Sequence, residues 1–189
     1  MDREQIRLRL PMLCTVAELE GSCPPPAIPA AVLVGLVARA EGPHVILTQR
    51  TELLSDHPAE ISLPGGRIEA SDEGPAAAAL REAFEEIGLP PEKTELLGCL
   101  PPYRTVTGFC VYPFVGWIEP PVEFALDERE VADVFEVPLS FVLDPANHLR
   151  ESILRDGEPH GYYVLPYPGR RIWGATAAIL VDLARILTA

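Results

Sequence analysis

Two aliphatic segments joined by a short turn place the strongest constraint on how this chain can fold. The segments AAVLVGLVARA (30–40) and HVILTQR (44–50) are rich in β-branched and aliphatic residues, which pack well on a pleated surface. The tripeptide EGP (41–43) between them contains the glycine and proline that are typical of turns. We therefore predict a β-hairpin near the centre of the fold.

Other segments alternate between strand and helix patterns. Strands are expected at LLGCL (96–100), at FCVYPFVGWI (109–118), and in a second hairpin formed by HLRESIL (148–154) and GYYVLPY (161–167). Helices are expected from about residue 74 to 87, after a short strand that ends at Pro138, and over IWGATAAILVDLARIL (172–187), whereas residues 51–63 are expected to form a loop. This mixture predicts an α/β fold in which helices pack on the faces of a mixed sheet.

The length and composition indicate one globular domain. With 189 residues, of which 48% are hydrophobic and 23% charged, the chain can bury a core of ordinary size. We divide it into an N-terminal arm, residues 1–26, which ends in a proline-rich run, and a single domain, residues 27–189. The arm is expected to pack against the domain or to form a homodimer contact.

The charge and the cysteines bear on partners and location. A formal net charge of -13 disfavours binding to nucleic acid or to an anionic membrane, because both need a clustered basic surface.

Four cysteines without a C-x-x-C pair are expected to remain reduced thiols: Cys14, Cys23, Cys99 and Cys110. The N-terminus lacks the apolar core of a secretory signal, and the longest apolar run, 27–38, is too short to span a bilayer. We predict a soluble cytoplasmic protein.

The segment PGGRIEASDEGPAAAALREAFEEIGL (64–89) contains a helix that carries closely spaced carboxylates. At about 100° per residue, one side is an apolar stripe and is expected to face the core: Ala76, Leu80, Ala83, Phe84 and Ile87. The opposite side carries Arg81, Glu82, Glu85 and Glu86. Most such charged faces are simply solvated.

The spacing of these glutamates also fits a metal site. Like charges three or four residues apart cost roughly 0.2 to 0.5 kcal/mol per pair in a helix, and Arg81 can offset only Glu85. A divalent cation such as Mg²⁺ or Mn²⁺, which prefers hard oxygen ligands, would reverse this repulsion. Upstream, Gly65 and Gly66 lack a Cβ, so the backbone could come close to a metal or a phosphate. The residues by themselves leave both interpretations open, a solvated acidic face and a metal–carboxylate site.

The same segment resembles a known family motif. From Gly66, six residues lead to Glu73, seven more lead to Arg81, and REAFEEIGL (81–89) follows. This is similar to the Nudix box of the Nudix hydrolases, with one extra residue between the glycine and the first glutamate. The preceding ILTQRTELLSDHPAEISLPGG (46–66) resembles the motif of the coenzyme A pyrophosphatase branch, and the resemblance extends over roughly residues 30–187.

The resemblance implies a fold and an activity. The fold would be a Nudix-type α/β/α sandwich with a mixed sheet, and the reaction would be the metal-dependent hydrolysis of a diphosphate. The substrate would be coenzyme A or acyl-coenzyme A, cleaved to adenosine 3′,5′-bisphosphate and phosphopantetheine or its acyl derivative. Compared with the coenzyme A motif, Thr51 replaces serine or alanine, Ser55 replaces arginine and Ala59 replaces glycine. These departures keep an alternative open, a Nudix hydrolase of ADP-ribose, dinucleotide polyphosphates or nucleoside triphosphates. A non-catalytic nucleotide-binding domain is a second alternative.

The resemblance also implies roles for individual residues. Mg²⁺ or Mn²⁺ would be held by Glu82, Glu85 and Glu86, with Gly66 beside them. Arg81 would hold the glutamates in position. Glu73 is expected either to support the metal site or to act as a carboxylate favoured by the helix dipole.

The proton acceptor and the substrate contacts are less constrained. Glu82, Glu128 and Glu130 are candidates for the base that accepts the proton of the attacking water. The small-molecule diphosphate substrate is expected to bind Arg50, which can meet a phosphate with two hydrogen bonds, together with Arg104 and the backbone at Gly65.

Overall fold

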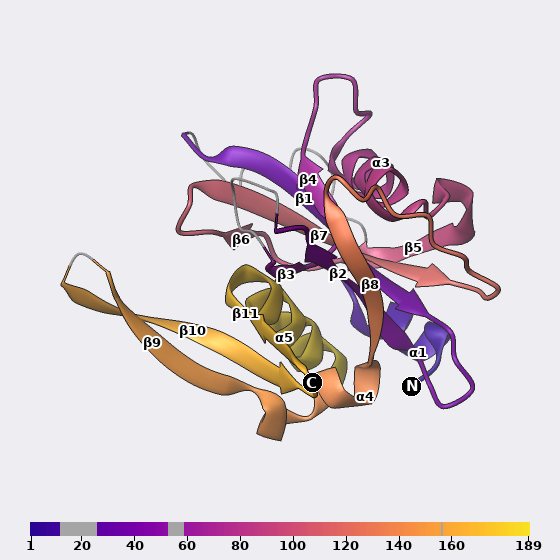
Figure 1. The fold of residues 1–189 in the computed structure, drawn as a ribbon. Coiled ribbons are helices and arrows are strands. Elements are labelled where there is room, and N and C mark those ends of the chain that lie inside the picture. The colour runs from indigo at the N-terminus through magenta and orange to yellow at the C-terminus, as the bar shows by residue number, and fades with distance from the viewer. Residues whose placement is uncertain (12–25, 53–58, 156) are drawn as a thin grey trace.

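The computed structural model describes residues 1–11, 26–52, 59–155 and 157–189, and its centre is one mixed β-sheet (Figure 1). The strands of this sheet are β1 (Ile28–Val37), β2 (His44–Arg50), β3 (Ile61–Ser62), β4 (Gly65–Arg67), β5 (Thr94–Cys99), β6 (Tyr103–Arg104), β7 (Phe109–Ile118) and β8 (Val131–Pro138). The main order is β3-β2-β1-β7-β5, with β8 paired to β2, β4 to β1 and β6 to β7. Strands β1 and β7 run parallel along their whole length, whereas the other pairs are antiparallel.

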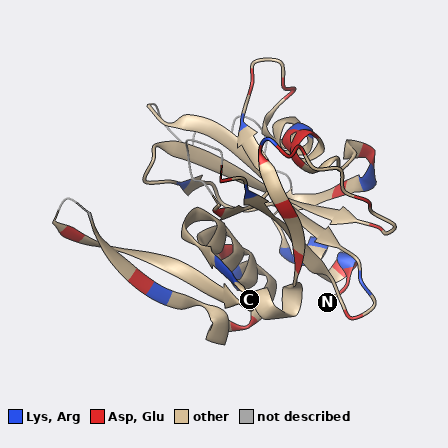
Figure 2. Ribbon diagram, in the orientation of Figure 1, with Lys and Arg blue, Asp and Glu red and all other residues tan. Residues whose placement is uncertain are grey.

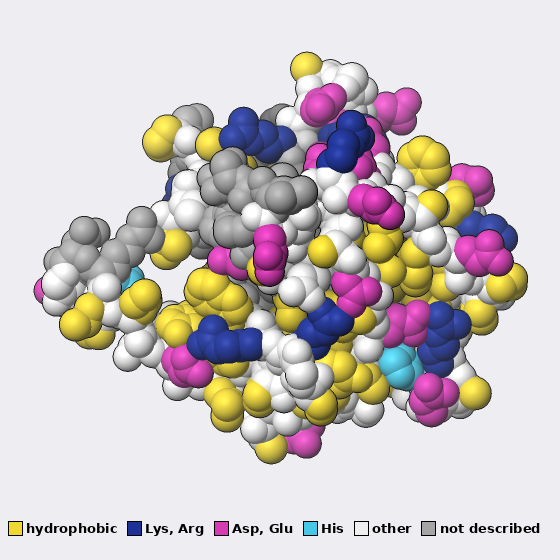
Figure 3. Space-filling view, in the orientation of Figure 1, with side chains coloured by type: hydrophobic (Ala, Val, Ile, Leu, Met, Phe, Trp, Pro, Cys, Tyr) yellow, Lys and Arg dark blue, Asp and Glu magenta, His cyan; other side chains and the backbone are white. Residues whose placement is uncertain are grey.

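A smaller sheet and several helices complete the fold. The smaller sheet has the order β11-β10-β9, formed by β9 (Leu149–Arg155), β10 (Glu158–Tyr167) and β11 (Arg170–Trp173). The helices are α1 (Arg3–Arg9), α3 (Pro75–Ile87), α4 (Leu139–Leu143) and α5 (Gly174–Thr188), with short 3-10 turns at Pro91–Lys93 and Pro145–Asn147. The far end of the β9–β10 hairpin stands away from the body and carries exposed Ile153 and Leu154 (Figures 1 and 3).

Side chains along the central strands point alternately to the two faces of the sheet, and this creates two separate hydrophobic cores. In β1, Leu33 and Val37 pack with helix α3, whereas Val34 and Leu36 lie in the cluster that contains helix α5. Because successive side chains of a strand point to opposite faces, one apolar strand can serve both layers. The result is an α/β/α sandwich with a mixed sheet, which confirms the predicted fold class.

The predicted central hairpin forms only near its turn. Leu36 pairs with Val45 and Val37 with His44, but the first half of β1 pairs instead with β4, where Ala31 lies opposite Gly66. Strands β2 and β4 therefore share one edge of β1 and diverge from each other. The second predicted hairpin, the strand that ends at Pro138 and the helix over 74–87 are confirmed.

The end of the chain differs in one respect from the prediction. Residues 172 and 173, expected to begin the closing helix, belong with Arg170 and Arg171 to strand β11, and helix α5 starts at Gly174. Within the expected loop 51–63, Ile61 and Ser62 form strand β3, because they pair with Gln49 and Thr48. Residues 53–58, including Ser55, lie outside the described residues.

The N-terminal arm contributes to the core. In α1, Ile6 is fully buried in the α5-side cluster, and Arg3 and Arg7 both pair with Glu95 of β5. This agrees with the expectation that the arm packs against the domain. Residues 12–25 lie outside the described residues, and the homodimer contact stays a prediction.

The expectation of reduced thiols is wrong for two cysteines. Cys99 and Cys110 are each buried and disulfide-bonded, whereas Cys14 and Cys23 lie outside the described residues. Within the described part of the chain, no helix has the length and hydrophobicity needed to cross a bilayer. The cytoplasmic location stays a prediction.

Ala59 adopts a backbone conformation that favours glycine, with φ at 59°. We expect Ala59→Gly to raise the free energy of unfolding by about 0.5–1 kcal/mol, since relief of left-handed strain exceeds the added entropy of the unfolded chain. Urea unfolding followed by circular dichroism measures the change. Ala40→Gly, at an exposed loop position without positive φ, is the control and should be neutral or destabilising. A loss of stability in Ala59→Gly would contradict the prediction.

Candidate functional site

Helix α3 packs on the main sheet through small side chains. Ala78, Ala79 and Ala83 are buried, so the helix backbone can approach β1 closely. The predicted apolar stripe is wrong in part, because Phe84 is 52% exposed whereas Glu86 is only 4% exposed. The buried face therefore follows the alanines and carries Glu86 into the interior beside the forked edge of β1.

Both ends of α3 are fixed by glycines and by a following loop. Gly74 precedes Pro75, and Gly88 adopts the left-handed conformation that commonly ends a helix. Beyond the helix, the N–H of Ala125 donates to the carbonyl of Ile87, and the N–H of Asp127 donates to that of Glu86. The loop before β8 is thereby held against the carboxyl end of the glutamate helix.

Glu86 is a buried carboxylate with few compensating contacts. Its Oε2 accepts a hydrogen bond of 3.4 Å from the N–H of Gly65. Burial, reinforced by the charge of Glu82, raises the pKa of Glu86 to about 8, although the Arg50 guanidinium acts in the opposite direction. An ionised Glu86 is thus costly in this protein unless a further positive charge approaches it.

Glu82 lies directly over the second glycine of the pair. A Cβ added to Gly66 would lie 2.5 Å from Oε1 of Glu82, so no other residue fits here without displacing the carboxylate. Burial also raises the pKa of Glu82, in opposition to its contact with Arg81. The structure therefore brings Glu82, Glu86, Gly65 and Gly66 together, and their role in metal binding stays a prediction.

Arg81 ties the helix to the preceding loop. Its guanidinium donates to Asp72 at 2.8 and 3.0 Å, to Glu82 and Glu85 at 3.0 Å each, and to the backbone carbonyl of Arg67 at 3.0 Å. Figure 2 shows these mixed charges gathered on α3 and the adjoining β4 segment. Glu85, held by Arg81, remains 56% exposed at the side chain. Arg81 therefore orients two of the three glutamates.

Asp72 is a residue of this site that the sequence pattern alone does not single out. Its side chain is only 5% exposed, and the hydrogen bonds from Arg81 lower its pKa. Glu73, the neighbour that was predicted to support the site, is exposed just before the helix and makes no ion pair with a described residue. When the family motif is counted from Gly66 without the extra residue, its first acidic position falls on Asp72 and not on Glu73. The sequence therefore contains a signal for Asp72 when it is counted in this way.

Arg50 and Glu130 adjoin the glutamates from the sheet side. The β2–β8 pairing is irregular between Gln49 and Arg50, and the N–H of Thr51 donates to the carbonyl of Glu130. The charges of Arg50 and Glu130 both affect the pKa of Glu86. Nε of Arg50 is buried and has no hydrogen-bond partner among the described residues. An anionic ligand would satisfy it.

Arg104 lies at a different place from these residues. It lines a hollow of about 230 Å³ beside the β6–β7 turn, together with Phe109 and Thr105. Arg67, which follows Gly66, places its guanidinium 5.6 Å from the Phe109 ring centre. No contact between described residues joins Arg104 to Glu82 or Glu86. Its predicted role in substrate binding stays a proposal.

The donor set fits a divalent cation that keeps several waters. Within the ranges that the structure describes, no three Asp, Glu, His or Cys side chains converge into one metal-binding group. Glu82 and Glu86 supply hard oxygen ligands in a site where burial opposes their charges. Mg²⁺ is commonly bound by one or two carboxylates together with water and substrate phosphate. The residues present therefore fit such an ion.

Comparisons with known proteins agree with this geometry. The model of the NUDIX domain family matches residues 28–156. A protein from Enterobacter sp. (strain 638), named as an uncharacterized Nudix hydrolase NudL, is 44% identical over 155 residues, which cover 82% of this chain and 80% of that protein.

Solved structures share the fold. The binary complex of the C. elegans Ap4A hydrolase has a TM-score of 0.51 at 22% identity and covers 59% of this chain and 80% of its own. RenU, a Nudix hydrolase from M. smegmatis, has a TM-score of 0.52 at 24% identity, and the match covers 60% of this chain and 72% of RenU.

The contact between Arg81 and Asp72 predicts a pH-dependent contribution to stability. Because the pKa of Asp72 is lowered by folding, this contribution is full above the unfolded pKa of roughly 4 and is lost as the pH falls below it. Asp72→Asn should therefore be less stable than the unmodified protein at pH 7, and the difference should shrink toward pH 3. Urea unfolding at both pH values measures it.

Glu73→Gln is the matched control for this experiment. Glu73 is exposed, so its neutralisation should leave stability unchanged within about 0.5 kcal/mol. An equal effect of the two substitutions, or a difference that grows toward pH 3, would contradict the role of Asp72.

Proposed function

Because the chain belongs to the Nudix family of hydrolases, which act on phosphoric anhydrides, we propose that its substrate is the diphosphate of coenzyme A or acyl-coenzyme A. The products would be adenosine 3′,5′-bisphosphate and phosphopantetheine or its acyl derivative. The observation that carries the chemistry is the placement of buried Glu86 and partly buried Glu82 against Gly65 and Gly66. The substrate assignment is supported by the resemblance of residues 46–66 to the coenzyme A motif.

Residues of the chain can hold the metal ion, orient the carboxylates and compensate the negative charge of the diphosphate. Glu82 and Glu86 would hold Mg²⁺ or Mn²⁺ beside the Gly66 backbone, with Glu85 near the exposed side. When bound, the ion would supply Lewis-acid stabilisation of the phosphoryl oxygens and would activate a water molecule. Arg81 acts as a positioning residue, since it fixes the carboxylates of Glu82 and Glu85 and is itself held by Asp72.

Arg50 is proposed to bind the diphosphate. Its buried Nε has no partner among the described residues, and a phosphate oxygen would provide one. Glu130 and Glu82 stay the best-placed candidates for accepting the proton of the attacking water, because the charge of each influences Glu86. Glu128 is exposed, and no described contact connects it with this group.

The test is a product analysis by mass spectrometry. The protein is offered coenzyme A, ADP-ribose, diadenosine polyphosphates and nucleoside triphosphates in parallel, with Mg²⁺ and with Mn²⁺. We expect selective release of adenosine 3′,5′-bisphosphate from coenzyme A. Intact coenzyme A beside cleavage of another diphosphate would refute the substrate assignment and favour the broader Nudix alternative.

Substitution of the buried glutamate separates catalysis from binding. Glu86→Gln preserves the size of the side chain and an acceptor for the Gly65 N–H, but it removes a proposed metal ligand. We expect kcat to fall by more than about 100-fold. Steady-state kinetics at saturating metal measure the change.

Glu85→Gln is the control for this experiment, and its more exposed side chain predicts a smaller loss. Unchanged turnover in Glu86→Gln would exclude this site. A protein that binds nucleotide equally well before and after substitution and never turns over would support the non-catalytic alternative.

A further inference from the structure

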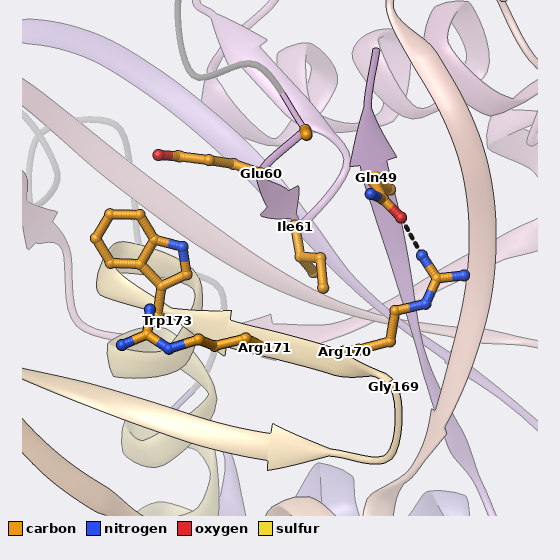
Figure 4. A pocket seen from close by; sticks show the side chains of 8 residues that line it. Gln49, Glu60, Ile61, Gly169, Arg170, Arg171 and Trp173 are labelled. Atoms are coloured by element: carbon orange, nitrogen blue, oxygen red, sulfur yellow. Dashed lines mark hydrogen bonds between the residues drawn. The ribbon is translucent and has the colours of Figure 1, made fainter. Parts of the chain in front are cut away.

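A hollow of about 400 Å³ lies between the two sheets (Figure 4). One wall is formed by Glu60 and Ile61, at and just before strand β3, and the other by Gly169, Arg170, Arg171 and Trp173, in and just before β11. Strands β3 and β11 approach each other but belong to different sheets, and no ladder joins them in the described structure. The hollow therefore separates two strand edges.

Strand β11 directs backbone groups into this hollow. The β10–β11 hairpin has a two-residue turn at 168–169, so Tyr167 and Arg170 form its closing pair. In such a hairpin the two residues of the closing pair are hydrogen-bonded to each other. Because hydrogen-bonded and non-hydrogen-bonded pairs alternate, the N–H and C=O groups of Arg171 and the N–H of Trp173 face away from β10. The carbonyl of Trp173, the N-cap residue, belongs to the first turn of α5. Pro166, which has no N–H, lies opposite Arg171, as this register requires.

Strand β3 presents a matching edge. The N–H of Arg50 donates to the carbonyl of Glu60, so the backbone of Glu60 faces β2 and that of Ile61 faces the opposite way. The carbonyl of Ile61 accepts a hydrogen bond of 3.1 Å from Oγ1 of Thr176, and its N–H lies on the same side of β3, away from β2. An extended group with amide donors and acceptors can pair with both edges, as an added strand does.

The side chains around the hollow favour an uncharged ligand over a phosphate. Arg171 is paired with Glu151 at 2.6 Å, and Arg170 is paired with Asp133 and bonded to Gln49. Both guanidinium charges are therefore compensated.

The apolar part of the lining is aromatic. Trp173 remains 37% exposed, and it is supported by Tyr162, whose ring centre is 5.7 Å away in an edge-to-face contact. Figure 4 shows Trp173 and Ile61 on opposite sides of the space, with Arg170 turned toward Gln49. The lining thus combines backbone amides with an exposed aromatic ring.

The hollow lies at the same end of β2 as the glutamates. Gln49 lines it, whereas the next residue, Arg50, carries the charge that acts on Glu86. Alternation along β2 places these two side chains on opposite faces of the sheet. A ligand bound through its diphosphate near Arg50 could extend over the end of β2 into the hollow.

We propose that the hollow binds the pantetheine arm of coenzyme A, with its two amides paired to the backbone of Ile61 and of Arg171 and its distal end against Trp173. The arm is a flexible chain of aliphatic segments separated by amides, which is the pattern that two strand edges and an aromatic ring can recognise. This inference rests on the proposed function, since it assigns one part of the same substrate to a second site.

The first test uses a backbone-directed substitution. Arg171→Pro removes the N–H that faces the hollow, and Arg171→Ala is its matched control, which loses the same side chain but keeps the N–H. The comparison ligand is adenosine 3′-phosphate 5′-diphosphate, which has the nucleotide and the diphosphate but no arm. We expect Arg171→Pro to raise the KM for coenzyme A up to about tenfold over the control, with the inhibition constant of the comparison ligand unchanged. Equal KM values, or equal loss for both ligands, would overturn the proposal.

The second test does not depend on turnover. The chain has two tryptophans, Trp117 and Trp173, and Trp117 is buried. Pantetheine alone, titrated without metal, should change the tryptophan fluorescence of the protein, and Trp173→Phe should abolish the change. No change in the unmodified protein, or a change that persists in Trp173→Phe, would refute the site even if coenzyme A is hydrolysed. Binding of pantetheine by a protein that leaves coenzyme A intact would refute the proposed reaction instead.

Discussion

The divided edge of strand β1 is the constraint on which the rest of the site depends. On one side, β1 pairs with β7 from Ile28 to Val37 without interruption, which keeps it extended. On the other side, β4 pairs with the first half of β1 and β2 pairs with its last residues. These two partners must therefore separate from each other. The separation leaves room beneath helix α3 for side chains that a continuous sheet would exclude. Glycine at positions 65 and 66 is needed there because carboxylate and backbone meet without space for a Cβ.

A buried carboxylate is an unfavourable component that the remaining structure must support. The alanine face of α3 and the hydrogen bonds from Ala125 and Asp127 hold the helix where Glu86 has little contact with solvent. Energy stored in this way can be recovered when an ion or a phosphate supplies the missing charge. The same packing that destabilises the ionised side chain thus prepares it for a ligand.

Periodicity in the sequence was sufficient for the layers of the fold but not for the details of the site. Long aliphatic strands and the alanine-rich helix follow from local pattern, and a site formed by Glu82, Glu86 and two glycines is one of the two interpretations that their spacing leaves open. The buried side of α3 could not be predicted in this way, because the alanines at 76–79 show no contrast in hydrophobicity and the large, exposed Phe84 misleads a helical wheel. The choice of Asp72 over Glu73 as the partner of Arg81 depends on how β4 pairs with β1, which is a non-local contact. Short strands such as β3 and β11 likewise exist only because of distant partners.

Helix α1 has a consequence for the order in which the molecule can be assembled. Ile6 shares one apolar cluster with Leu180 and Leu183 of helix α5, although almost the whole chain separates them. During synthesis from the N-terminus, Ile6 emerges long before these neighbours and must wait for them, since contacts between distant parts of a chain are the slowest to form. The cluster on the α3 side of the sheet needs no residue beyond Val134, so it can be completed earlier. It can therefore be organised, glutamates included, while the opposite layer is still open.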